Sequence, residues 1–152
     1  MTTTTVAYTD LTSLVGTELG PTEWREITQA QVNTFADATD DHQWIHVDAE
    51  RALKESPFGA PVAHGFLTLS LTVKFWSELF ELHGVTTKVN YGLDKVRFVS
   101  PVKVGARIRM NAVIAEVEEV KGGYQFAVDQ TIEIEGSDRP AVVARGIYRF
   151  YA

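Results

Sequence analysis

Apolar and polar residues alternate through most of the second half of the chain. Between residues 123 and 135, one side of the alternation carries large apolar side chains: Tyr124, Phe126, Val128, Ile132 and Ile134. The positions between them are mostly polar, as in a β-strand with one dry and one wet face. The pattern in this half predicts four strands bounded by turns that contain glycine or proline, near residues 87–99, 106–119, 123–135 and 141–151.

Two glycines interrupt the strand pattern. In the first predicted strand, the apolar positions change phase around Gly92, between Val89 and Val96. One extra residue in a strand produces such a shift, so we expect a β-bulge and a bent sheet at this point. Gly146, midway along the last predicted strand, indicates a place where another group packs close to the backbone.

The first half of the chain has helical signals. Thr28 and Gln31 have the spacing of a capping box, and apolar residues then recur on one helical face. A second, short helix is predicted after an N-cap at Asp48, and Pro57 ends it. The segment from Thr39 to Val47 lies between these helices and is expected to be a loop.

A third helix is predicted from Ala63 to Leu82. Leucines alternate with threonine and serine at its start, as in a half-buried strand, but the run continues for about 20 residues without a turn signal. We therefore predict a helix that is buried on all sides. Its small hydroxyl residues can return hydrogen bonds to the backbone carbonyl one turn back.

These elements predict a curved antiparallel sheet wrapped around a long central helix, which is an α+β fold. The chain has 152 residues, of which 45% are hydrophobic and 22% charged, and no repeat or linker divides it. We expect one domain over residues 1–152. The threonine run near the start predicts a frayed N-terminus over residues 1–10.

Composition narrows the possible functions. The chain has no cysteine, no secretory signal pattern and no apolar run long enough for a membrane span, so a cytoplasmic protein without membrane contact is expected. A net charge of −6 argues against nucleic-acid binding. A small anionic group needs only a local basic cluster, and the residues that offer one, or that are simply solvated strand residues, are Lys95, Arg97, Lys103, Arg107 and Arg109.

The loop from Thr39 to His46 is the first candidate for chemistry. It concentrates titratable groups beside two large apolar residues, a setting in which pKa values move. The alternative is a turn in which Asp40 and Asp41 accept hydrogen bonds from backbone amides. His42 and His46 superficially match the zinc motif H-E-x-x-H, but Gln43 stands in place of the glutamate and no helix is expected here, so no metal is predicted.

The His64-Gly65 pair precedes the predicted central helix. A helix N-terminus presents unpaired backbone N–H groups, and a glycine there lets a ligand carbonyl come close, which suits an oxyanion. For His64 we favour a different interpretation, a core histidine whose polar atoms are satisfied. No G-x-S-x-G, G-x-G-x-x-G or P-loop motif occurs, so a serine nucleophile and nucleotide-driven chemistry have no support.

These two segments resemble the MaoC-like family of (R)-specific enoyl-CoA hydratases, which have the hot-dog fold. The family signature S/T-G-D-x-N-P-L/I-H, followed by H-G-M/F-L, reads here as Thr39-Asp40-Asp41-His42-Gln43-Trp44-Ile45-His46 and His64-Gly65-Phe66-Leu67. The D-x4-H spacing selects Asp41 and His46. Val15-Gly16 and the stretch 90–98 are similar to the nodulation-protein-N-like and mycobacterial members, so the resemblance covers essentially the whole chain.

The resemblance implies a lyase that hydrates trans-2-enoyl-CoA to (R)-3-hydroxyacyl-CoA and also catalyses the reverse dehydration. It implies Asp41 and His46 as the catalytic pair. The implied oxyanion and substrate contacts are Gly65, Gln43, His64, Phe66, Asn90 and Arg97. No cofactor is implied beyond the coenzyme A or phosphopantetheine of the substrate, which is an acyl-CoA or an acyl carrier protein thioester. The implied active unit is a homodimer.

The chain departs from the signature at several positions. Gln43 and Trp44 replace Asn-Pro, Asp40 replaces glycine, and Val73 stands where some members have serine. These changes bear on acyl length and loop geometry. Two other functions stay open: a hot-dog acyl-CoA thioesterase, and a non-catalytic subunit that binds acyl thioesters.

Overall fold

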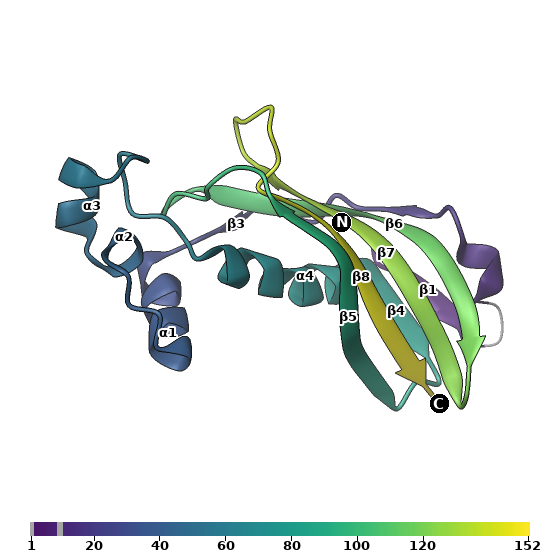
Figure 1. Ribbon diagram of the computed structural model, residues 1–152. Coiled ribbons are helices and arrows are strands. Elements are labelled where there is room, and N and C mark those ends of the chain that lie inside the picture. Colours follow the sequence, from purple (N-terminus) through teal and green to yellow (C-terminus); the bar gives the residue numbers. More distant parts are fainter. Residues whose placement is uncertain (1, 9–10) are drawn as a thin grey trace.

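A curved antiparallel sheet lies over helix α4 (Gly65–Leu79) in the computed structural model, which describes residues 2–8 and 11–152 (Figure 1). Four long strands form most of the sheet, as predicted: β5 (Thr87–Phe98), β6 (Arg107–Val120), β7 (Gly123–Ile134) and β8 (Val142–Tyr151). The order is β2-β6-β7-β8-β5, with the two-residue strands β2 (Glu18–Leu19) and β3 (Arg25–Glu26) both on β6. The predicted α+β architecture is therefore confirmed.

Both glycine predictions in the sheet are confirmed. The pairing of β5 with β8 shifts register between Asn90 and Gly92 and again between Leu93 and Lys95, which bends this edge strand. At Gly146, an added Cβ would lie 2.9 Å from the Tyr148 ring. The close approach inferred from sequence is thus a packing contact with this buried tyrosine.

The N-terminal segment and the end of the central helix differ from prediction. Helix α4 ends at Leu79, and the chain continues as β4 (Phe80–His83). Strand β1 (Thr4–Ala7) pairs with β4 in parallel, so the expected fraying is wrong for these four residues. The sequence gave no signal for this pairing because the partners are far apart in the chain. Residues 1, 9 and 10 of the predicted frayed end lie outside the described residues.

Helix α4 is buried on one side only, which corrects the prediction of complete burial. The side toward the sheet carries the buried residues Leu67, Leu71, Phe75, Trp76 and Leu79. The opposite side leaves Phe66 70% and Val73 44% exposed. A single curved sheet covers one face of a helix, so the remaining apolar side chains face outward in the single chain.

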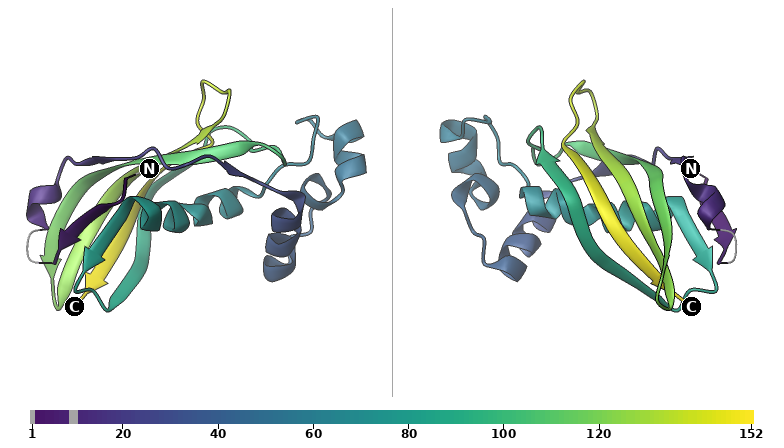
Figure 2. Two further views of the ribbon diagram at one scale, coloured as in Figure 1. Left: turned by 180° about the vertical axis from the view of Figure 1, so that it is seen from behind. Right: turned by 45° about the vertical axis from the view of Figure 1, so that its right-hand side comes forward.

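Three helices lie together beyond one end of the sheet, at the N-terminal end of α4 (Figure 2). They are α1 (Gln29–Thr39), α2 (Trp44–Val47) and α3 (Ala49–Glu55). Both predicted N-caps are confirmed: Thr28 Oγ1 accepts a hydrogen bond from the Gln31 N–H, and Asp48 Oδ1 accepts one from the Arg51 N–H. The predicted loop between α1 and α3 is wrong in one respect, because it contains the single-turn helix α2.

None of the described helices is both long enough and apolar enough to cross a membrane.

Candidate active site

The imidazole of His46 is held on several sides. Its Nδ1 lies 2.6 Å from the carbonyl oxygen of Val62, and its own backbone carbonyl accepts a hydrogen bond from Gln29 Nε2 at 2.8 Å. A carbonyl oxygen can only accept, so Nδ1 of His46 carries the hydrogen. In the neutral ring, Nε2 therefore presents a lone pair.

Burial sets the protonation state of His46. The residue is only 8% exposed, and this loss of water is the largest cause that lowers the pKa of the imidazole below 6.5. The neighbouring His64 lowers this pKa further, while the Val62 hydrogen bond and the Asp41 carboxylate raise it. The net direction is downward, so His46 is a neutral base at neutral pH.

Asp41 comes into the site through a sharp turn at the end of α1. The residue before it, Asp40, adopts a left-handed backbone conformation with φ of 57°, which ends the helix. The Asp41 side chain is 51% exposed. One of its carboxylate oxygens and one nitrogen from each of His46 and His64 all lie within 4.8 Å of one another.

This group of three suits proton transfer better than metal binding. The rings of His46 and His64 are stacked, with centroids 3.9 Å apart and planes inclined by 25°. Ring nitrogens bind metals along their lone pairs, in the ring plane, and nearly parallel planes do not converge well on one ion. A carboxylate and a neutral imidazole that face the same space can instead exchange protons through a shared water.

His64 contradicts the prediction of a fully satisfied core histidine. It is 2% exposed, and its Nε2 donates to the backbone carbonyl of Asp41 at 2.9 Å. Its Nδ1 is buried without a hydrogen-bond partner among the described residues. The side chain is thus a core residue with one polar atom left over, directly against the acid–base pair.

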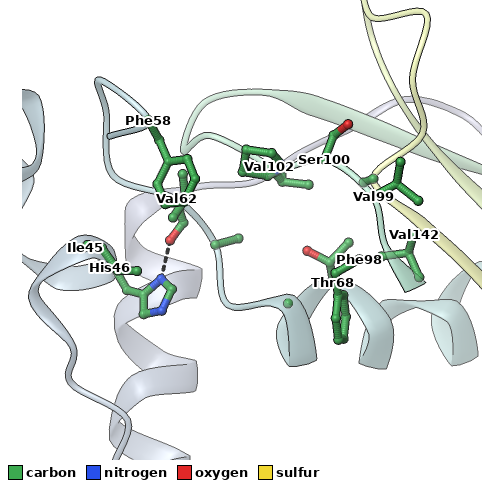
Figure 3. Close-up of a pocket in the computed structure, with 14 residues that line it drawn as sticks. Ile45, His46, Phe58, Val62, Thr68, Phe98, Val99, Ser100, Val102 and Val142 are labelled. Atoms are coloured by element: carbon green, nitrogen blue, oxygen red, sulfur yellow. Dashed lines mark hydrogen bonds between the residues drawn. The ribbon is translucent and has the colours of Figure 1, made fainter. Parts of the chain in front are cut away.

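A mostly apolar cavity of about 300 Å³ adjoins His46 (Figure 3). Gly65 and Thr68 of α4 form part of its wall, and His46 is the titratable side chain among the described residues that line it. Its other walls come from the turns after α3 and β5 and from the start of β8: Phe58, Val62, Phe98, Val99, Ser100, Pro101, Val102, Ala141 and Val142. Sequence reasoning missed most of these residues, since nothing in their local pattern distinguishes them from other turn and strand positions.

Gly65 is the first residue of α4, so its backbone N–H is one of those that the helix leaves unpaired. An added Cβ here would lie 3.0 Å from the Phe98 ring. Glycine therefore keeps the wall of the cavity open at the helix N-terminus. The position fits the predicted oxyanion site.

The remaining predicted contacts do not gather at this cavity within one chain. Gln43 is exposed, and Phe66 points outward with its ring edge-on to Phe98, at a centroid distance of 5.9 Å. Asn90 lines a second apolar hollow with Trp76, near the other end of α4. The side chain most distant in kind is Arg97, which borders a polar hollow with Asp129, Thr131 and Arg145 on the wet side of the sheet.

The predicted basic cluster is partly neutralised. Arg107 forms an ion pair with Glu135 at 3.2 Å, and Arg109 forms one with Glu133 at 2.6 Å. The Arg109 guanidinium also stacks over Trp24, 4.3 Å from the ring centroid. For these two arginines the interpretation as solvated, paired strand residues is the better one.

The chain resembles proteins of known families over nearly its whole length. The family described as the MaoC like domain matches residues 10–135. The chain is 48% identical over 144 residues to 3-hydroxyacyl-thioester dehydratase Z of Mycobacterium tuberculosis (strain ATCC 25618 / H37Rv), which covers 94% of this chain and 95% of that protein. It is 45% identical over 144 residues to Nodulation protein N of Rhizobium meliloti (strain 1021), with 93% and 89% covered.

Among solved structures, the fold is similar to that of the (R)-hydratase from A. caviae involved in PHA biosynthesis. The TM-score is 0.72 at 22% sequence identity, and the match covers 88% of this chain and 94% of that one. At this identity the likeness concerns the fold alone. It confirms the predicted hot-dog architecture, with the sheet wrapped around the central helix.

Proposed function

This chain belongs to the MaoC-like domain family and is a lyase of the hydratase/dehydratase class, and from that premise we propose that it reversibly hydrates trans-2-enoyl-CoA to (R)-3-hydroxyacyl-CoA. The observation that carries the proposal is the placement of the Asp41 carboxylate and the His46 imidazole within 4.8 Å of each other. His46 also borders an apolar cavity that begins at a helix N-terminus. The (R) stereochemistry rests on the resemblance of the two motifs to (R)-specific hydratases.

The reaction needs three functions from the protein. An enoyl thioester accepts a nucleophile at its β-carbon, so a base must take a proton from water as the new C–O bond forms. The electrons of the double bond move to the thioester, whose oxygen becomes an enolate that needs hydrogen-bond donors. An acid then delivers a proton to the α-carbon, and the overall change is the addition of one water.

Asp41 and His46 together fulfil the base and acid functions. Both are proton acceptors in the resting site, because the His46 ring is neutral and its Nε2 presents a lone pair. One water between them gives up a proton to the pair as its oxygen adds to the β-carbon. The pair then returns a proton to the α-carbon, which restores the resting state.

The Gly65 N–H is the donor for the enolate oxygen. It lies at the N-terminus of a 15-residue helix, where unpaired amides and the helix dipole favour negative charge. The apolar cavity next to it holds the acyl group, and the thioester carrier is coenzyme A or the phosphopantetheine of an acyl carrier protein. The 48% identical relative is itself named for action on 3-hydroxyacyl thioesters.

The active unit in this proposal is a homodimer. Among the described strands, β5 lies at the end of the six-stranded sheet with β8 as its one neighbour, so its outer backbone groups are unpaired. This edge strand exposes Tyr91, Leu93 and Phe98, next to the exposed Phe66 on α4. A second copy of β5, related by a two-fold axis, offers the same edge and the same apolar surface, which would cover both.

A turnover assay with crotonyl-CoA tests the function. We expect loss of the enoyl absorbance without release of free thiol, and a product of (R) configuration on chiral analysis. Release of free thiol with a saturated acyl-CoA would instead identify a thioesterase. Binding of crotonyl-CoA without any turnover would identify a subunit that only binds acyl thioesters. Either of these results would overturn the proposal.

A further inference from the structure

We propose that His64 is a positioning residue of the acid–base pair, which fixes the Asp41 main chain and the His46 ring relative to each other. This inference rests on the proposed function, since it concerns the same site. His64 precedes α4 directly and thereby also ties both groups to the helix end that carries Gly65.

Two contacts of one imidazole make this connection. The ring face of His64 stacks on His46 at a centroid distance of 3.9 Å, and its Nε2 lies 2.9 Å from the backbone carbonyl oxygen of Asp41. The Asp41 carboxylate itself is 3.9 Å away, beyond direct hydrogen-bond distance. Asp41 is otherwise weakly held, because its Oδ1 accepts only a long hydrogen bond of 3.5 Å from the Gln43 N–H.

The hydrogen bond to Asp41 fixes the tautomer of His64. A carbonyl oxygen accepts, so Nε2 carries the hydrogen, and Nδ1 is left as an acceptor. That Nδ1 is buried and has no partner among the described residues. A buried acceptor without a donor disfavours folding, so histidine is not the side chain that stability alone would select here.

Packing alone would be served equally well by an apolar ring. His64 lies between His46 and Phe35, whose ring centroid is 4.8 Å from that of His64. Phenylalanine would keep both ring contacts and would remove the unpaired nitrogen. What phenylalanine cannot supply is the donor to the Asp41 carbonyl, so this hydrogen bond is the property that distinguishes histidine.

Two variants separate the ring from the donor. His64→Phe keeps the ring and removes the donor, whereas His64→Gln keeps a donor at the end of a side chain of similar reach and removes the ring. His83→Phe is the matched control, because His83 is exposed on β4. For each protein we would measure kcat and KM with crotonyl-CoA, the thermal unfolding midpoint, and the backbone amide resonances of residues 40–43.

For His64→Phe we expect kcat to fall by roughly 10- to 100-fold with little change in KM, because a small displacement of a catalytic group is costly. Its unfolding midpoint should equal or exceed that of the wild type. His64→Gln should recover part of the lost kcat. The amide resonances of residues 40–43 should shift or broaden in His64→Phe and less so in His64→Gln, while His83→Phe matches the wild type throughout.

Failure of this inference is distinguishable from failure of the proposed function. If the wild type turns over crotonyl-CoA and His64→Phe does so equally well, the positioning role is wrong. If the wild type does not turn over the substrate, the proposed function fails, and the amide resonances still decide the positioning role. Unchanged resonances at residues 40–43 in His64→Phe would then overturn it, as would a loss of kcat matched by a loss of folded protein.

Discussion

At the scale of single residues, the two members of the acid–base pair are held very differently. His46 is buried, and hydrogen bonds from Gln29 and to Val62 fix its backbone and its ring. Asp41 is half exposed and depends on the turn at Asp40 and on the contact of its carbonyl with His64. The imidazole is therefore the fixed part of the pair, and the position of the carboxylate depends on its neighbours.

Removing either proton acceptor should stop turnover without unfolding the protein. We expect Asp41→Asn and His46→Gln each to lower kcat for crotonyl-CoA hydration by roughly two to four orders of magnitude, the usual contribution of a positioned acid or base. The chain offers matched controls in Asp40→Asn and His42→Gln, which alter exposed neighbours of the same types. Near-normal hydration by either site variant, with circular dichroism unchanged, would show that the pair is wrongly assigned.

The two histidines of the loop should titrate on opposite sides of pH 6.5. The pKa of His42 is raised by its 2.8 Å hydrogen bond to Asp37, whereas burial lowers the pKa of His46. Protonation of His46 would remove the base, so hydration should persist as the pH falls through 6.5 and decline only below it. NMR titration of the ring protons measures both values, with His42→Gln and His46→Gln to assign the signals. A pKa at or above 6.5 for His46 would contradict the expected order.

At the scale of secondary-structure elements, β8 is fitted closely to its neighbours. Tyr148 stacks on Trp76 of α4 at a centroid distance of 5.8 Å, and its hydroxyl accepts a hydrogen bond from Gln130 of β7. Gly146, two residues earlier on the same side of the strand, leaves the space that the Tyr148 ring and Gln130 occupy. The packing of α4 against the sheet thus depends on one missing side chain.

Filling that space should destabilise the protein. The Cβ of Gly146→Ala would lie 2.9 Å from the Tyr148 ring, a buried side chain with little freedom to move. We expect the free energy of unfolding to fall by about 1–3 kcal/mol, as for other overpacked cores, measured by urea denaturation. Gly92→Ala is the comparison, since an added Cβ there meets nothing within 4 Å. Equal stability of the two variants would argue against close packing at β8.

At the scale of the whole molecule, the exposed apolar side of α4 and the open edge at β5 belong to the same region. In a homodimer both would be buried, because the two-fold axis brings a second copy of each to cover the first. The cavity beside His46 is bordered by Phe98 from the same edge strand. Assembly and the shape of the substrate site are therefore expected to be linked.

A charge on this edge should disrupt the dimer. Leu93 is 45% exposed on β5, and Leu93→Arg would place two like charges near each other across the proposed interface. Sedimentation velocity should show a dimer for the wild type and a shift toward monomer for this variant at the same concentration. Leu53→Arg changes a leucine of α3 that is 64% exposed, and it should leave the dimer intact. A monomeric wild type would refute the proposed assembly.

Patterns within short segments predicted much of the structure. The caps at Thr28 and Asp48, the four long strands and the bulges near Gly92 all formed as expected, because backbone hydrogen bonding and side-chain alternation act over a few residues. Prediction failed where a segment depends on a distant partner. The end of α4 at Leu79 is such a case, since β4 continues the chain in order to pair with β1.

The sequence by itself determined which residues could carry the chemistry: the spacing of Asp41 and His46 and the glycine at the start of the central helix follow from local pattern and family resemblance. Only the tertiary structure decided how these groups meet. The Val62 carbonyl that orients His46 lies 16 positions away, and His64 reaches Asp41 across 23 positions. Any residue has a carbonyl and many histidines are buried, so their roles become visible only when folding brings them together.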